Sequence, residues 1–217
     1  MGDTLVERLA DKSMSTAELK ESVLRNPALL SEVLVGVNAS KAAVRYGCSK
    51  VLLELSEDSP DLLYPHMDFF VHLLDSKYRI LTWNALTIIA RLTGVDTKKK
   101  FDEIVEKYFG FFHDDYMVTV ATVVENAGTI ARAKPYLIPK ITKELLKVGE
   151  LKTGKHLTAE CRLVIAEKAI DSLTMFFDQV TNKQDVLSFV EQWTTSRRRP
   201  LREKARRFMN QWETSTT

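Results

Sequence analysis

The stretch LTWNALTIIARL, residues 81–92, decides the fold because it recurs in altered form along the chain. Its apolar side chains fall at the first, fifth, eighth, ninth and twelfth positions, which is the spacing of one face of an α-helix. The fifth position holds the small residue Ala85, which allows a neighbouring helix to approach closely. Similar stretches are VRYGCSKVLLEL at 44–55, VATVVENAGTIA at 120–131, RLVIAEKAIDSL at 162–173 and LREKARRFMNQW at 201–212.

An amphipathic stretch and a short polar turn precede each of these segments. The turns contain Asn, Asp, Ser and Gly, which favour turns and helix caps. Between one unit and the next, Asp and Ser again stand where helices begin, and Pro stands at or just before a helix start. Each unit therefore consists of a helix, a turn and a second helix, with the first helices predicted at 29–37, 62–74, 100–112, 136–151 and 183–193.

The two-helix unit and its period of about 40 residues resemble HEAT repeats, with armadillo repeats as a close alternative. The resemblance covers residues 25–212. It implies an all-α fold, a right-handed α-solenoid of about five HEAT-like helical hairpins with an extra N-terminal helix. The chain is then a single HEAT-like repeat domain over residues 1–217, with an N-terminal helical cap (1–24), repeats (25–60, 61–96, 97–135, 136–182 and 183–212) and a tail (213–217).

The third unit departs from the pattern. Its second helix aligns from either Val120 or Met117, and Gly128 stands where the other units carry a bulkier residue. A glycine in the apolar stripe leaves room for another backbone. We therefore expect either a tight helix crossing at Gly128 or a different register in this unit.

No residue pattern typical of an enzyme occurs. The eight glycines form neither a dinucleotide-binding nor a phosphate-binding loop, and no spacing of Cys and His suits zinc. His113 is followed by Asp114 and Asp115, but turn capping explains these carboxylates better than a metal does. We expect no cofactor, no metal and no catalytic residue.

The two cysteines, Cys48 and Cys161, lie in apolar helical stretches, and we expect both to be buried free thiols. The first residues lack the apolar segment of a secretory signal. No run approaches the roughly 18 apolar residues of a membrane-spanning helix. The sequence therefore predicts a cytoplasmic protein that does not associate with membranes.

Basic residues concentrate toward the C-terminal end of the sequence. Residues 131–217 contain 17 Lys and Arg against 10 Asp and Glu, whereas residues 1–130 contain 14 against 19. The densest segment, 196–207, is either the charged outer face of a terminal repeat or a site for phosphate or an acidic protein surface. The candidate partner-binding or phosphate-binding residues are Arg197, Arg198, Arg199, Arg202, Lys204, Arg206 and Arg207.

These patterns predict a non-catalytic interaction or scaffold module that binds a protein partner through its helical surface. The second helices are expected to offer Arg45, Arg79, Arg91 and Arg162 as contacts. The alternative is a nucleic-acid-binding protein resembling the DNA alkylation repair glycosylases, which are built from HEAT-like repeats. A second basic track would support that alternative, with Lys98, Lys99, Lys100, Arg132, Lys134, Lys140, Lys143 and Lys147 on one face.

Overall fold

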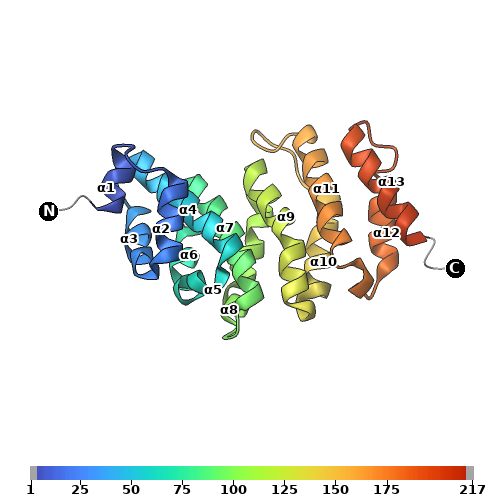
Figure 1. Cartoon of the computed structure of the whole chain (residues 1–217). Helices are drawn as coiled ribbons and strands as arrows, with labels where there is room; N and C mark the ends of the chain where they lie inside the picture. The colour runs from blue at the N-terminus through green and yellow to red at the C-terminus, as the bar shows by residue number, and fades with distance from the viewer. Residues whose placement is uncertain (1–3, 214–217) are drawn as a thin grey trace. The chain divides into compact units, whose positions relative to one another are not determined.

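The computed structural model describes residues 4–213, and within this range every regular element is helical (Figure 1). The chain divides into two compact units, residues 1–101 and 102–217, which are described separately. The predicted repeat boundaries remain a prediction. Of the predicted tail, residues 214–217 lie outside the described part of the chain, whereas Glu213 is the last residue of a helix.

The first unit contains two N-terminal helices and two helical pairs. Its α-helices are α1 (Leu5–Ala10), α2 (Thr16–Arg25), α3 (Leu30–Gly36), α4 (Ala42–Asp58), α5 (Pro60–Leu63), α6 (Met67–Leu73) and α7 (Arg79–Leu92). Short 3-10 helices join them, namely η1 (Pro27–Leu29), η2 (Tyr64–His66) and η3 (Thr93–Val95). Helices α4 and α7 are the longest of this unit and pack against each other.

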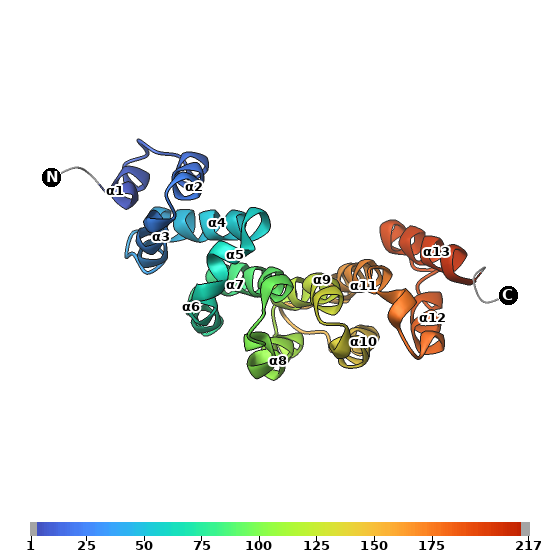
Figure 2. The same ribbon diagram turned by 60° about the horizontal axis from the view of Figure 1, so that its bottom comes forward.

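The second unit contains three further pairs, and its first helix begins at the boundary between the units. The α-helices are α8 (Lys100–Gly110), α9 (Met117–Ala133), α10 (Ile138–Leu146), α11 (Ala159–Thr174), α12 (Lys183–Glu191) and α13 (Arg199–Glu213). The 3-10 helices are η4 (Phe111–His113), η5 (Pro135–Leu137), η6 (Lys147–Glu150) and η7 (Phe177–Gln179). In this unit α9, α11 and α13 form one layer, and α8, α10 and α12 form the other (Figure 2).

The N-terminal segment forms two helices rather than the single helical stretch that the sequence indicated. Thr4 and Ser15 each begin a helix with a capping box, in which a glutamate three residues later completes the reciprocal hydrogen bonds. Between the two helices Lys12 adopts a positive φ of 68°, which no continuous helix allows. A strong second start signal at Ser15 therefore divides the segment.

The predicted apolar stripes form the core of each unit. In α4 the stripe residues are almost completely buried, and the stripe of α7 is buried to the same degree. The later second helices follow the same rule, except that Arg162 and Trp212 at the ends of their stripes stay partly exposed. Burying one such aliphatic side chain contributes about 1.5–3 kcal/mol. The buried stripe residues of α4 and α7 are Val44, Cys48, Val51, Leu52, Leu55, Leu81, Ala85, Ile88, Ile89 and Leu92.

The tight crossing expected at Gly128 is present. A Cβ atom added to Gly128 would lie 2.6 Å from Sδ of Met175 and 3.0 Å from the carbonyl oxygen of Ser172. The hydroxyl of Ser172 donates to the carbonyl oxygen of Val124 at 2.5 Å, so a polar contact joins the two helices at the same level. Of the helix pairs in residues 102–213, α9 and α11 make the most extensive contact.

Within each unit, ion pairs join segments that are about one repeat apart in the sequence, and they share a direction. The basic residue comes later in the chain and the acidic residue comes 31 to 43 positions earlier. The contact between Lys20 and Asp58 has the opposite order. An exposed pair contributes at most about 1 kcal/mol. These back-directed ion pairs are Arg91–Glu57, Lys100–Asp68, Lys134–Asp102, Lys140–Glu106, Lys168–Glu125, Arg197–Glu160, Arg198–Glu160, Arg198–Glu167, Lys204–Glu167 and Lys204–Asp171.

The two cysteines differ in accessibility, and the difference gives a first prediction. Cys48 is fully buried, and this burial raises the pKa of its thiol to about 11, so that it stays protonated at mildly alkaline pH. Cys161 is only partly buried, contrary to expectation. We expect a thiol reagent to label Cys161 in the native protein and both cysteines in denaturant. Two fast-reacting thiols in the native protein, or rapid labelling of the Cys161→Ser variant in its native state, would contradict this assignment.

Candidate functional site

Much of the basic C-terminal segment is used to attach α13 to α11. The Nε of Arg198 lies 3.1 Å from a carboxylate oxygen of Glu167, and its Nη1 lies 3.2 Å from Glu160. The Nζ of Lys204 lies 3.2 Å from Glu167 and also pairs with Asp171. The hydrogen bond to Glu167 is the main cause that raises the pKa of the Arg198 guanidinium. These two bases therefore already have carboxylate partners within the fold.

The other predicted binding residues differ in whether a carboxylate pairs with them. Arg199 pairs with Glu203 on the same helix at 2.6 Å. Arg202 donates to the carbonyl oxygen of Ser196 at 2.7 Å, and Arg206 donates to that of Thr194 at 2.9 Å, so these hydrogen bonds are made to neutral acceptors rather than to carboxylates. Arg207 is exposed on α13. The segment is thus partly neutralised.

A groove beside this segment is lined by two residues that carry buried hydrogen-bond donors without partners. It has a volume of about 480 Å³, and no carboxylate is among the described residues that line it. Nε of Arg162 and Nε1 of Trp193 are both buried without a hydrogen-bond partner. We call this the donor groove, and it is lined by Ala159, Arg162, Leu163, Gln192, Trp193, Thr195, Ser196 and Arg197.

Arg197 connects the donor groove to the basic segment. Its side chain is 73% exposed, and its closest carboxylate contact is to Glu160 at a long 3.4 Å. Arg162 extends from the first turn of α11 and Trp193 follows the end of α12, so the groove depends on how these two helices pack. Because guanidinium and indole N–H groups can only donate, the groove is suited to an acceptor with negative charge.

Of the four second-helix arginines named from the sequence, Arg45 and Arg91 serve the fold. Arg45 is buried, with its guanidinium 3.8 Å from the ring centre of Tyr78 and hydrogen bonds to two backbone carbonyls. Arg91 donates to the carbonyl oxygen of Leu53 and pairs with Glu57. Arg79 is exposed, and of the four only Arg162 lines the donor groove.

Half of the predicted basic track is occupied by ion pairs. Lys134 is buried against Asp102 at 3.3 Å, and Lys100, Lys140 and Lys147 also have carboxylate partners. Four members are exposed, namely Lys98, Lys99, Arg132 and Lys143.

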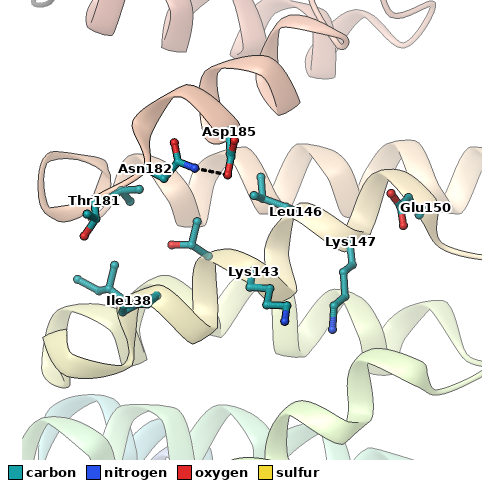
Figure 3. Close-up of a pocket in the computed structure, with 11 residues that line it drawn as sticks. Ile138, Lys143, Leu146, Lys147, Glu150, Thr181, Asn182 and Asp185 are labelled. Carbon is teal, nitrogen blue, oxygen red and sulfur yellow. Dashed lines mark hydrogen bonds between the residues drawn. The ribbon is translucent and has the colours of Figure 1, made fainter.

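A second hollow lies along α10 (Figure 3). Its volume is about 470 Å³, and its walls come from one face of α10 with η6, and from the segment that leads into α12. We call it the α10 pocket. It is lined by Ile138, Pro139, Thr142, Lys143, Leu146, Lys147, Glu150, Val180, Thr181, Asn182 and Asp185.

The acidic turn after η4 has the geometry expected of a cap. A carboxylate oxygen of Asp114 accepts from the backbone N–H of Tyr116 at 2.8 Å. The ring of His156 stacks on that of Tyr116 with centroids 4.2 Å apart. Among residues 4–213, no group of three or more His, Cys, Asp or Glu side chains is placed to hold a metal ion. In the same range, no helix has the length and apolar character required to cross a membrane.

The comparisons with known proteins support the fold. No family model and no curated protein matches the sequence. Among solved structures, the chain is similar to a designed armadillo repeat protein, YIII(Dq)4CqI, with a TM-score of 0.63 and 14% sequence identity, over 95% of this chain and 90% of that one. A likeness at this identity concerns the fold alone. The resemblance seen in the repeated helical stretches is thereby confirmed, and the chain has the all-α solenoid fold of the armadillo and HEAT-like repeat proteins.

Proposed function

We propose that the protein is a non-catalytic interaction module that binds an acidic segment of a protein partner in the donor groove. The observation that carries this proposal is the pair of buried, unpartnered donors on Arg162 and Trp193 beside the exposed Arg197. A buried donor without a partner costs about 1–3 kcal/mol. A carboxylate that moves into the groove would satisfy such donors after a small side-chain adjustment.

The solenoid architecture supports the same proposal. Stacked helical pairs expose long surfaces of side chains held by rigid elements, which suits recognition of an extended chain. The neutral part of the groove, with Leu163 and Ala159 beside Gln192 and Thr195, offers apolar and amide contacts to a peptide. These contacts accommodate a polypeptide that carries glutamate or aspartate together with ordinary side chains.

The test is a binding titration of the full chain with a labelled glutamate-rich peptide, with a lysine-rich peptide of equal length as control. Replacing Arg162 and Arg197 together by glutamine is expected to weaken binding of the acidic peptide about 10- to 100-fold, because two charge-assisted hydrogen bonds are lost. The matched control is Arg132→Gln, which removes an exposed positive charge outside the groove. Equal losses for the control and the groove variant would contradict a specific site.

Arg198 and Lys204 are unsuitable for this test because their removal leaves Glu167 with an uncompensated, largely buried charge. Trp193→Phe is preferable, since it removes the indole N–H and keeps a smaller aromatic ring. The last part of the test is a titration of the full chain with duplex DNA. If the duplex binds more tightly than the acidic peptide, and with a steep loss on adding salt, the nucleic-acid alternative replaces the proposal.

A further inference from the structure

One wall of the α10 pocket is built from a single helix face. Ile138, Thr142, Leu146 and Glu150 are spaced by four residues, so they lie along one side of α10 and η6. Figure 3 shows Ile138 and Glu150 toward opposite ends of this row, with Asn182 and Asp185 across from it. The pocket is therefore elongated, and it is separate from the donor groove, with which it shares no lining residue.

The floor of the pocket is apolar and its size suits a small organic molecule. Of the apolar lining residues, Ile138 and Val180 are buried and Leu146 is half-buried. The volume of about 470 Å³ lies within the range of roughly 300–1,000 Å³ found for small-molecule sites, which combine an apolar lining with a few polar groups.

One polar group in the lining is unsatisfied. Thr142 is only 8% exposed, and its Oγ1 is buried without a hydrogen-bond partner. A threonine inside a helix normally donates to the carbonyl four residues earlier, as Thr122 does to Val118 at 2.7 Å in α9. Rotation about χ1 of Thr142 exchanges the positions of its hydroxyl and methyl groups, which gives a ligand oxygen access to the hydroxyl.

The charges around the pocket favour a ligand without net charge. Lys143 and Lys147 extend to one side of α10, whereas Asp185 lies on the other side, where Asn182 donates to it (Figure 3). Glu150 stands at the far end, and Lys147 pairs with Glu144 at 2.7 Å. Since both signs are present around this one pocket, an anion or a cation meets a like charge as well as an opposite one, whereas a neutral molecule meets no charge of its own sign.

We propose that the α10 pocket binds a small neutral ligand with an apolar body and one hydroxyl or carbonyl oxygen. The apolar body lies over Ile138, Leu146 and Val180, and the oxygen forms a hydrogen bond with Oγ1 of Thr142. This site is additional to the donor groove, and the proposal does not depend on peptide binding there.

The experiment uses three probes with the same eight-carbon tail, namely 1-octanol, octanoate and octylammonium. Binding to the full chain is followed by backbone amide chemical shifts in NMR spectra. Octanol is expected to bind most tightly, with its largest shifts in residues 138–150 and 180–185. Octanoate or octylammonium binding more tightly, or shifts centred elsewhere, would overturn the proposal, as would the absence of saturable shifts for octanol.

The variant Thr142→Val tests the role of the hydroxyl, because valine keeps the branched shape. It is expected to weaken octanol binding about 2- to 10-fold, the loss of one ordinary hydrogen bond. The control is Thr122→Val, which removes a hydroxyl that is already bonded within α9 and lies outside the pocket. Unchanged octanol affinity in Thr142→Val, or an equal loss in the control, would exclude Thr142 as the recognition group.

Discussion

Replacing Gly128 by valine is expected to lower the free energy of unfolding by about 3 kcal/mol, at the upper end of the usual cost of overpacking. The Cβ alone would lie 3.0 Å from the backbone carbonyl oxygen of Ser172, and backbone cannot move aside as a side-chain end can. The two γ-methyl groups of valine add to this conflict. The helices α9 and α11 must then separate, which also breaks the hydrogen bond from the hydroxyl of Ser172 to the carbonyl oxygen of Val124. Denaturant unfolding of the full chain, followed by circular dichroism, measures the loss.

Two alanine variants distinguish the effect of the close helix contact at Gly128 on stability from the effect of helix propensity. Alanine is preferred over glycine inside a helix by about 1 kcal/mol. Gly110 ends α8 with nothing within 4 Å of its added Cβ, so Gly110→Ala is expected to leave stability unchanged or increase it. Gly128→Ala is expected to be destabilising despite the same propensity gain. Equal effects at the two positions would show that the crossing tolerates a side chain.

Replacing Asp96 by alanine is expected to cost about 3 kcal/mol, because one buried carboxylate satisfies three donors. Its oxygens accept from the hydroxyl of Tyr64 at 2.7 Å and from the backbone N–H groups of Lys100 and Phe101 at 2.8 and 3.0 Å. Asp96 is only 8% exposed, so water cannot readily replace it. The start of α8 and the contact to η2 would be lost together. The same denaturant titration measures the cost.

Two further variants test this explanation for Asp96. Tyr64→Phe removes one of the three donors and is expected to cost clearly less than Asp96→Ala, about 1 kcal/mol. Asp61→Ala removes an exposed carboxylate in the first turn of α5 and is expected to change stability by less than about 0.5 kcal/mol. A loss in Asp61→Ala as large as that in Asp96→Ala would indicate a general charge effect.

The stripes of the second helices were predictable because burial imposes the same helical spacing on each one. Gly128 was recognisable as an exception within that spacing, and the tight crossing was one of the two explanations that the sequence left open. The division between α1 and α2 combines the capping box of Ser15 and Glu18, which the sequence contains, with the left-handed conformation of Lys12, for which no local residue pattern gives a signal. Helix spacing predicts which faces are apolar and gives weaker information about where a helix stops.

The binding surfaces were less predictable because they depend on contacts between units distant in sequence. In the sequence alone, the basic segment looks like a cluster of unpaired charges. Its carboxylate partners Glu160, Glu167 and Asp171 lie about one repeat earlier in the chain. Comparing charges at the repeat period would have revealed these partners. By contrast, the missing partners of Trp193 and Thr142 follow from the detailed packing of α10, α11 and α12, which no local pattern reports.

The common direction of the back-directed ion pairs has a consequence for how such a chain can change length. An internal helical pair carries a base for its predecessor and an acid for its successor, as α11 does with Lys168 and Glu167. Duplication of that pair in place would therefore supply every new junction with opposite charges. Exchanging the order of two internal pairs would keep a base opposite an acid at each junction, whereas turning one pair round within the stack would set carboxylates against carboxylates. Charge therefore fixes the direction in which each module is stacked and leaves the order of the modules to shape.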